Sequence, residues 1–328
     1  MAGEFDLIEK YFKRPVRHAR LGGGDDCALI APASGIELAV STDMLVEGTH
    51  FLPGTGALRL GHKTLAVNLS DLAAMGAAPR YATLALALPG VDAAWLAAFA
   101  RGFFTLADQH GVELIGGDTT RGPLTLCVTV FGEVPAGQAV KRSGAQAGDD
   151  IWVSGTLGDA ALGLAHLKGE VTLAPAQADY AVTRLEAPTP QIALGLALRG
   201  TATAMIDLSD GLAGDVGHIA KASGLDAQVQ AASLPQAPLL AAHWASLPPA
   251  GRLRLCAAGG DDYELCFTAA LAHRAQVEAV AAQCGVRVTN IGSMTAPRGA
   301  AGAVLVMDAS GNPCLPTVSG FDHFKEPA

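Results

Sequence analysis

Two periods of hydrophobic residues alternate along the first part of the chain and predict a mixture of helices and strands. Between positions 58 and 75, apolar residues such as Leu65, Leu69 and Leu72 recur every three or four positions, which is typical of a helix with one buried face. The short apolar-rich segment 81–88 lacks this period and is typical of a strand. The same criteria predict further helices at 5–12 and 92–110, and further strands at 27–31, 36–41, 112–115 and 124–134.

A connection rich in glycine divides the chain into two parts. Residues 135–150 contain three glycines and the basic pair Lys141 and Arg142, which is typical of a link between domains. We therefore predict an N-terminal domain over 1–140 and a C-terminal domain over 150–328. The second part is expected to contain strands at 151–154, 203–206, 263–268, 286–291 and 303–307, and helices at 158–168, 190–199, 212–222 and 272–284. The predicted class is α/β, or α+β.

The composition excludes several classes of protein. The 328 residues are 50% hydrophobic and 16% charged, with a formal net charge of -9, so the chain can form cores but lacks the basic surface that binds nucleic acid. Neither a secretory leader nor an apolar run of about 18 residues is visible, so no membrane association is predicted. The six cysteines form no C-x-x-C pair and are interpreted as reduced core residues. We expect a soluble cytoplasmic protein.

The common catalytic motifs are missing from the sequence. A P-loop is excluded because the nearest fragment, Gly61-His62-Lys63-Thr64, has the wrong order and lies inside the predicted helix. Neither G-x-G-x-x-G after a strand nor H-E-x-x-H occurs, and the segment 207–211 fails the G-x-S-x-G pattern because it begins with aspartate. Dinucleotide-binding, zinc-protease and serine-hydrolase functions thereby lose their main support.

Aspartates instead collect where predicted elements begin or end. The segments are Gly24-Asp25-Asp26, Ser41-Thr42-Asp43, Asn68-Leu69-Ser70-Asp71, Gly116-Gly117-Asp118-Thr119-Thr120 and Ile206-Asp207-Leu208-Ser209-Asp210-Gly211. Two carboxylates about 4 Å apart repel by roughly 4 kcal/mol at an effective dielectric of about 20, so a cluster of them needs bound cations. Hard oxygen ligands suit Mg²⁺, which bridges carboxylates to phosphates. The pattern predicts a magnesium and phosphate site, with a helix cap or turn as the alternative for each aspartate alone.

Motifs spread over almost the whole chain resemble those of the thiamine-monophosphate kinases. Besides the aspartate segments, they are Gly3-Glu4-Phe5, Gly48-Thr49-His50-Phe51, the runs 63–76 and 116–121, Arg142-Ser143-Gly144, the run 259–264 and Gly320-Phe321-Asp322-His323-Phe324. Each motif alone is shared with relatives such as aminoimidazole ribonucleotide synthetase and selenophosphate synthetase. The first and last motifs favour the kinase.

The resemblance implies a two-domain fold like that of aminoimidazole ribonucleotide synthetase. In such a fold the N-terminal domain binds ATP and magnesium, and its mixed sheet pairs across a homodimer, while the C-terminal α/β domain closes over the nucleotide. The implied reaction converts ATP and thiamine monophosphate to ADP and thiamine diphosphate by direct in-line transfer, assisted by several Mg²⁺ ions. An acceptor that is already an anionic phosphate needs metal ions more than a strong base, which suits a site with many aspartates.

The resemblance also implies roles for individual residues. Magnesium ligands are expected at Asp26, Ser41, Thr42, Asp43, Asp71, Asp118, Asp207 and Asp210, of which Asp43 and Asp210 are expected to be catalytic. ATP is expected to contact Gly117, Asp118, Arg142 and Ser209. Thiamine monophosphate is expected to contact His50, Asp261 and Phe321, although the family more often has glutamate at the position of Asp261.

Two alternatives remain open at this point. The first is another ATP-dependent enzyme of the same superfamily, but the cysteine-rich N-terminal segment of selenophosphate synthetases is missing, since Cys27 directly follows the aspartates. The second is a nucleotide-binding maturation factor, against which the lack of a cysteine in the closing Glu326-Pro327-Ala328 counts. A kinase with the two substrates and no nucleic-acid partner is the preferred interpretation.

Overall fold

The chain folds into two units, and the computed structural model describes residues 4–314, with side chains from residue 6 onward. The first unit comprises the residues up to Leu72 together with Ala77–Ala139 and Glu186–Ile192. The second comprises Ala73–Gly76, Val140–Leu185 and the residues from Ala193 onward. Each unit combines one sheet with several helices, which confirms the predicted α/β class.

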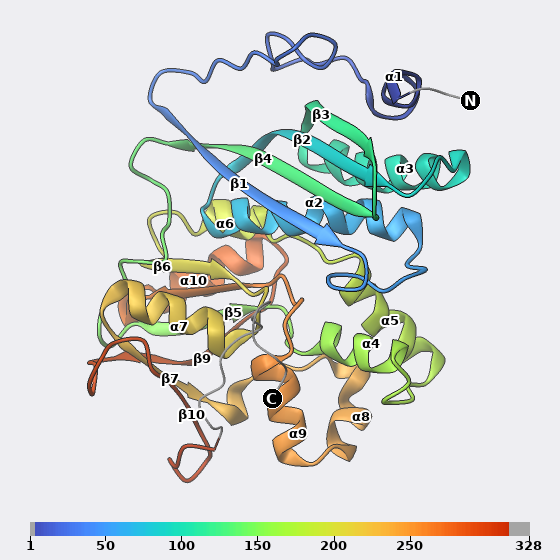
Figure 1. The fold of residues 1–328 in the computed structure, drawn as a ribbon. Helices are drawn as coiled ribbons and strands as arrows, with labels where there is room; N and C mark the ends of the chain where they lie inside the picture. Colours follow the sequence, from blue (N-terminus) through green and yellow to red (C-terminus); the bar gives the residue numbers. More distant parts are fainter. Residues whose placement is uncertain (1–3, 315–328) are drawn as a thin grey trace. The chain divides into compact units, whose positions relative to one another are not determined.

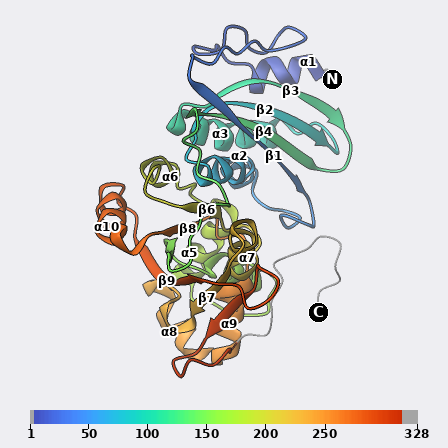
Figure 2. The same ribbon diagram turned by 90° about the vertical axis from the view of Figure 1, so that its left-hand side faces the viewer.

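The first unit is built on a mixed four-stranded sheet with the order β1-β4-β2-β3. The strands are β1 (Ile36–Val46), β2 (Ala78–Leu88), β3 (Glu113–Arg121) and β4 (Thr125–Pro135). β4 pairs antiparallel with β1 and β2, whereas β2 pairs parallel with β3. The parallel pair needs a long crossover, which α3 (Ala93–His110) provides. α2 (Ala57–Ala74) and α3 lie on the same face of the sheet (Figures 1 and 2). The chain begins with the short α1 (Glu4–Leu7) and a π-helical turn (Ile8–Phe12), which precede β1.

The helix-covered face is buried because strand residues alternate in direction. Leu126, Val128 and Val130 of β4 are completely buried, while the residues between them keep part of their surface exposed. From α3, Phe99 and Phe103 are also completely buried. These side chains form the apolar core that holds the first unit together.

α2 and α3 approach each other so closely that their main chains touch. A Cβ atom added at Gly61 of α2 would overlap the carbonyl oxygen of Phe99. A Cβ atom added at Gly102 of α3 would likewise overlap the carbonyl oxygen of Leu58. Only glycine permits this distance between two helices. The contact therefore fixes the position of α2, which carries the predicted ligand segment 68–71.

The opposite face of this sheet is only partly covered. At one end, Val16 and Ile30 of the segment before β1 pack against a small cluster that contains Tyr81 and Ile115. On the edge strand β1, Val40 and Met44 keep 55% and 53% of their surface exposed. Large apolar side chains exposed together on a sheet face are typical of an interaction surface.

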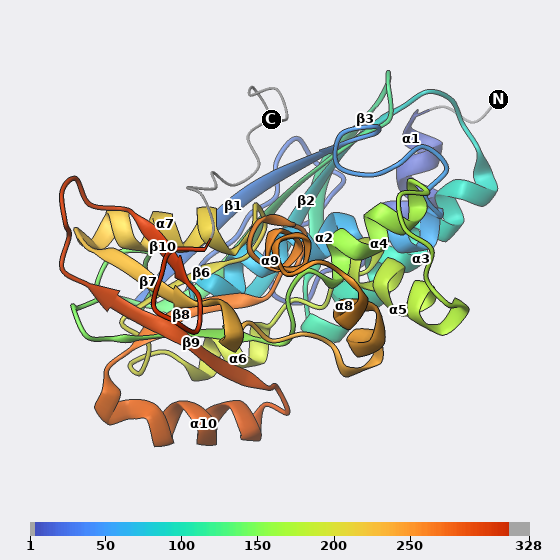
Figure 3. The same cartoon turned by 90° about the horizontal axis from the view of Figure 1, so that it is seen from below.

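The second unit contains a six-stranded sheet with the order β10-β7-β9-β5-β8-β6. β7 and β10 pair in parallel, and all other neighbours are antiparallel. Figure 3 shows α7 (Leu212–Ser223) on one face of this sheet and α10 (Arg274–Gln283) on the other. The strands are β5 (Asp150–Ser154), β6 (Ala204–Asp207), β7 (Asp226–Gln230), β8 (Leu265–Ala269), β9 (Val288–Thr295) and β10 (Val304–Met307).

Further helices complete the second unit, and several of them were not predicted. The helices are α4 (Asp159–Leu167), α5 (Pro175–Glu186), α6 (Ile192–Ala197), α8 (Ala241–Ser246) and α9 (Pro249–Ala258), with short 3-10 turns at Ala231–Ser233, Pro238–Leu240 and Leu271–His273. The helices α5, α8 and α9 and the strand β7 were missed. In α5 only Ala181 and Leu185 are buried, so its sequence shows too few apolar positions to reveal the helical period.

Three local predictions are wrong in instructive ways. The segment 27–31 forms no strand, because only the isolated bridge between Leu21 and Leu29 joins it to the rest. The strand predicted at 36–41 extends beyond Asp43, which still pairs with β4. The strand predicted at 112–115 extends beyond Asp118, which still pairs with β2. These two aspartates therefore lie within strands instead of following them.

The cysteines divide between core and surface. Cys256 and Cys266 are buried, which confirms the predicted core position, whereas Cys27 and Cys314 are exposed, and for them that prediction is wrong. Cys27 is exposed because it lies in the turn before β1 that forms no strand. No helix in the described part of the chain is long and apolar enough to span a bilayer.

Candidate functional site

In the first unit, two hydrogen bonds join the predicted ligand segments of β1 and α2. Ser41 and Asp43 lie on the same face of β1, since they are two positions apart. The Ser41 hydroxyl donates to Asp71 Oδ2 at 2.5 Å, and the main-chain N–H of Asp43 donates to Asn68 Oδ1 at 2.9 Å. Asn68 is completely buried and also donates to the Thr64 carbonyl oxygen. Oxygen ligands from a strand and a helix are thus brought together here.

Thr42 points to the other face of the sheet. Its hydroxyl forms a 2.8 Å hydrogen bond with the hydroxyl of Thr129, the residue directly opposite on β4. A contribution of Thr42 to the same metal shell as Asp43 would therefore have to come from its main-chain oxygen. Ser41, on the correct face, is better placed to offer a hydroxyl.

Asp26 and His50 lie in the loops on either side of β1. Asp26 is exposed in the turn between the bridged residues Leu21 and Leu29. His50 is held from two sides, because its Nδ1 accepts the main-chain N–H of Val46 at 3.0 Å and its carbonyl oxygen accepts from the buried Lys63 ammonium at 3.4 Å. These bonds fix His50 in its loop.

Gly117 and Asp118 lie on the edge strand β3. Gly117 has φ +153°, and a Cβ atom there would overlap the main chain of Leu84 on β2. The adjacent Asp118 pairs with Ala85 and exposes its side chain. The two strands thus approach each other closely next to an exposed carboxylate.

In the second unit, the loop between β6 and α7 carries Asp207, Ser209 and Asp210. Asp207, the last residue of β6, is buried, and the other two are half-buried. The buried Asp215 of α7 accepts the main-chain N–H groups of Asp210 and Gly211 at 3.2 and 3.1 Å. Burial and the neighbouring Asp210 carboxylate raise the pKa of Asp215 to about 7. The two hydrogen bonds lower this pKa, but their effect is smaller. The sequence gives no signal for this supporting role of Asp215, because it depends on burial.

Asp261 lies against this same loop. Its main-chain N–H donates to the Ser209 carbonyl oxygen at 2.8 Å, and the N–H of Tyr263 donates to the Leu208 carbonyl oxygen at 2.8 Å. The structure therefore brings a predicted thiamine-phosphate ligand and a predicted ATP ligand together within the second unit.

Arg142 lies near the β6–α7 loop, because its positive charge lowers the pKa of Asp215. Arg142 is exposed in the connection before β5, and its carbonyl oxygen accepts the Ser223 hydroxyl at 3.3 Å. Phe321 lies outside the described residues. The roles proposed for both therefore remain predictions.

Within residues 4–314, no three or more His, Cys, Asp or Glu side chains gather closely enough to hold a metal ion by themselves. Mg²⁺ typically takes only one or two carboxylates and completes its shell with water and substrate phosphates. The paired oxygen ligands on β1 and α2, and those of the β6–α7 loop, fit that mode of binding and do not fit a cage made only of protein ligands.

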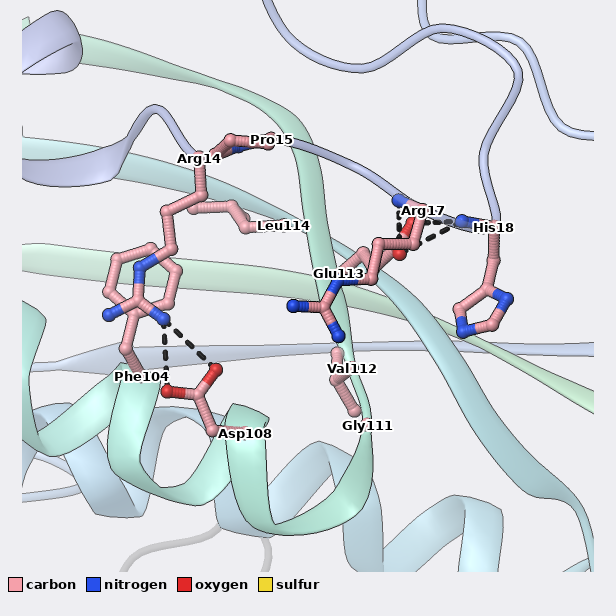
Figure 4. Close-up of a pocket in the computed structure, with 10 residues that line it drawn as sticks. All are labelled: Arg14, Pro15, Arg17, His18, Phe104, Asp108, Gly111, Val112, Glu113 and Leu114. Atoms are coloured by element: carbon pink, nitrogen blue, oxygen red, sulfur yellow. Dashed lines mark hydrogen bonds and ion pairs between the residues drawn. The ribbon is translucent and has the colours of Figure 1, made fainter.

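A pocket of the first unit lies apart from these residues (Figure 4). It has a volume of about 530 Å³ and includes the side chains of Arg14, Phe104, Asp108 and Glu113. Arg14 stacks on the Phe104 ring, 3.6 Å from its centroid, and donates to both carboxylate oxygens of Asp108 at 3.0 Å.

Glu113, in the same pocket, also holds the N-terminal segment in place. It accepts main-chain N–H groups from the segment before β1, those of Arg17, His18 and Ala19. Burial raises the pKa of Glu113, but these donors outweigh it and hold the pKa below its usual value. Glu113 therefore holds the N-terminal segment that leads to Asp26 against β3.

Comparison with known proteins gives consistent matches over both units. Models of the AIR synthase related proteins match residues 24–134 with their N-terminal domain and residues 146–304 with their C-terminal domain. A thiamine-monophosphate kinase of Escherichia coli strain K12 is 48% identical over 330 residues, which cover 99% of each chain. The crystal structure of a thiamine-monophosphate kinase from Stenotrophomonas maltophilia K279a is 46% identical with a TM-score of 0.82, over 90% of this chain and 92% of that chain. A structure of AaThiL complexed with AMPPCP and TMP is 28% identical with a TM-score of 0.77, over 90% of this chain and 89% of that chain.

Proposed function

The chain belongs to the thiamine-monophosphate kinase family of the AIR synthase related proteins, and on this premise we propose that it transfers the γ-phosphoryl group of ATP to thiamine monophosphate. The observation that carries the proposal is the match to a kinase of that name over 99% of both chains. The AaThiL structure supports both substrates, because AMPPCP is an ATP analogue and TMP is the acceptor.

The residues present fit magnesium as the metal of this reaction. Ser41, Asp43 and Asp71 would supply hard oxygen ligands from the first unit, and Asp207 and Asp210 would supply them from the second. Asp26 and Asp118, both exposed, would add carboxylates from a loop and from β3. When bound, several Mg²⁺ ions would neutralise the charge of the phosphates.

The protein's own groups would bind and orient the two substrates. Gly117, Ser209 and Arg142 would contact ATP, with the guanidinium offering a fork of donors to phosphate oxygens. His50, which the main-chain N–H of Val46 holds in its loop, would contact thiamine monophosphate. Asp261 would contact the same substrate from beside Ser209, with a shorter reach than the glutamate common in the family. Phe321 would pack on the thiamine rings.

The proposed transfer is a single in-line displacement. An oxygen of the acceptor phosphate forms a bond to the γ-phosphorus while the bond from that phosphorus to the β,γ-bridging oxygen breaks, and ADP leaves with that electron pair. The attacking oxygen is already an anion, so no side chain must remove a proton from it. The contribution of the chain is then positioning and charge neutralisation.

The function is tested by measuring thiamine diphosphate made by the purified protein from ATP, Mg²⁺ and thiamine monophosphate, with unphosphorylated thiamine as a parallel acceptor. We expect product from the phosphate ester only, and none when EDTA removes the metal. ATP binding in Mg²⁺ without any thiamine diphosphate would contradict the proposal and would favour another activity within the superfamily. Product formed from thiamine itself would contradict the proposed acceptor.

We further propose that the partly covered sheet face of the first unit binds a second copy of the chain. Val40 and Met44 lie on this face of β1, on either side of Thr42, and both are more than half exposed. Covering them would remove apolar surface from water, which stabilises association. The mixed sheet would then pair across a homodimer, as the family resemblance implies.

Replacing Met44 with glutamate should convert such a dimer to monomers, because a charge would be buried in the apolar contact. Light scattering coupled to size-exclusion chromatography measures the result. Val91→Glu is the matched control, since Val91 is 59% exposed but lies before α3 and outside this face. A wild-type monomer, or an equal effect of the two substitutions, would contradict the proposed interface.

A further inference from the structure

The loop that carries Asp261 has an unusual backbone. Asp261 and Tyr263 have φ values of +59° and +48°, and they are the residues other than glycine with positive φ among those the structure describes. This left-handed region is rarely adopted by residues with a Cβ atom, and backbone strain of this kind is typically found at functional sites. Something in the surrounding structure must hold the loop in this conformation.

Arg184 of α5 holds the loop at two points. Its Nη2 donates to the Asp262 carbonyl oxygen at 3.2 Å, between the two strained residues, and to Glu264 Oε1 at 2.7 Å, directly after them. The guanidinium thus joins the centre of the loop to its end. Both bonds come from the single nitrogen Nη2, so they depend on where the guanidinium places that nitrogen.

The partners of Arg184 are themselves fixed from another direction. Glu264 accepts the Ser154 hydroxyl at 2.5 Å, and the Asp262 carboxylate accepts the main-chain N–H of Gly158 at 3.0 and 3.1 Å. Ser154 is the last residue of β5 and Gly158 directly precedes α4, so both donors belong to the segment 154–158. The loop is therefore clamped between α5 and this segment, whereas Asp261 remains half-buried and is joined to Ser209 through its main-chain N–H.

The network is buried and rich in acidic groups. Asp262 and Glu264 are 2% exposed and Asp159 is 0% exposed, and burial raises the pKa of all three carboxyls. Arg184 faces all three carboxyls, of which Asp159 belongs to α4 and the other two directly precede β8. It also faces the hydroxyl of Tyr180, which lies on α5 like Arg184 itself. Cys256 of α9 faces Asp159 and Asp262. Arg184 therefore offsets the repulsion among carboxyls that would otherwise push the loop outward.

We propose that Arg184 is a positioning residue for the acceptor substrate, which holds the strained loop 260–263 so that Asp261 meets thiamine monophosphate beside the ATP ligand Ser209. The proposal rests on the proposed function, because that function gives Asp261 its substrate. Arg184 itself touches neither substrate. Because the loop carries the acceptor ligand Asp261, the effect should be larger on the binding of the acceptor than on the binding of ATP.

The test compares Arg184→Gln and Arg184→Lys with wild type in the thiamine diphosphate assay. At pH 8 we expect Arg184→Gln to raise the KM for thiamine monophosphate about tenfold or more and to change the KM for ATP less than about twofold, which is the effect of a lost charged hydrogen bond. Arg184→Lys should restore about half of the lost free energy, since it keeps the positive charge but does not place a nitrogen at the position of Nη2. Lowering the pH to 6 should reduce the defect of Arg184→Gln, because protonated carboxyls repel each other less.

Arg274→Gln is the matched control within the same unit. Arg274 forms a two-point ion pair with the buried Asp150, and Asp150 lies at the first position of β5, outside the 260–263 loop. We expect this variant to lower Tm without raising the KM for the acceptor. Equal rises of both KM values in Arg184→Gln, or the same rise in Arg274→Gln, would overturn the proposal.

Hydrogen exchange without substrates separates this proposal from the proposed function. We expect amides of 260–264 to exchange at least about tenfold faster in Arg184→Gln than in wild type, with unchanged exchange in β6 and α10. Unchanged exchange in 260–264 would overturn the clamp even if the enzyme is a kinase. Faster exchange of 260–264 in Arg184→Gln, together with a wild-type protein that makes no thiamine diphosphate, would support the clamp and reject the acceptor assignment.

Discussion

Asp43→Asn is expected to lower kcat by about 10²–10³-fold while the fold remains intact. The substitution keeps the size of the side chain and removes the charge that a bound metal ion requires. The structure predicts little damage elsewhere, because β1 is held at this position by the main-chain N–H of Asp43, which donates to Asn68 and is unchanged in the variant. Steady-state kinetics at several Mg²⁺ concentrations, together with Tm, measure the effect. Asp210→Asn is expected to behave in the same way, because its N–H to Asp215 is also retained.

Asp92→Asn is the control for this prediction. Asp92 caps α3 by accepting the N–H groups of Ala94 and Trp95, and asparagine caps a helix nearly as well as aspartate. The control should therefore retain wild-type turnover. Full activity of Asp43→Asn in saturating Mg²⁺ would show that Asp43 is not a metal ligand.

Gly117→Ala is expected to destabilise the first unit by about 3 kcal/mol or more. The φ of +153° is unfavourable for alanine, and the new Cβ atom would overlap the main chain of Leu84, which cannot move without breaking the β2–β3 pairing. Because Asp118 follows directly, ATP binding should fall with the stability. Chemical denaturation and equilibrium binding of ATP measure the two effects.

Gly116→Ala is the matched control, one residue earlier on the same strand. A Cβ atom there would lie 3.9 Å from Thr83 Cγ2, which is ordinary van der Waals contact, so a change below about 1 kcal/mol is expected. Similar losses in the two variants would mean that the close approach at Gly117 does not decide the stability of the sheet.

The sequence predicts the elements that have a strong period of their own. The apolar stripe through Leu65, Leu69 and Leu72 identifies α2 almost to its ends, because these residues recur at helical spacing. The predicted single buried face is too narrow, since the helix is buried on almost all sides from residue 60 to residue 74. The ends of β1 and β3 could not be predicted, since polar residues such as Thr42 and Asp118 remain in a strand only as long as a neighbouring strand pairs with them. Helix α5 was missed because it buries few of its residues.

The candidate site shows a similar limit. Motifs identify the residue types that suit phosphate and magnesium, and the structure joins Ser41 to Asp71 within the first unit. The residues that hold these groups in place carry no motif. Asp215 and Arg184 act through burial and through bonds to main-chain atoms, which depend on how distant segments pack. Such contacts are set by tertiary structure, so sequence patterns alone do not reveal them.

The glycine contact between α2 and α3 has a consequence for sequence divergence in this protein. Side chains at a helix interface normally exchange with one another as a core evolves, because a gain in volume on one helix is accommodated by a loss on the other. At Gly61 and Gly102 no such exchange is available, since main-chain atoms already occupy the space. The distance between the two helices is therefore independent of changes in the surrounding core. Asn68 and Asp71 lie about two and three turns after Gly61 on α2. They keep their alignment with β1 while the apolar residues around them remain free to vary.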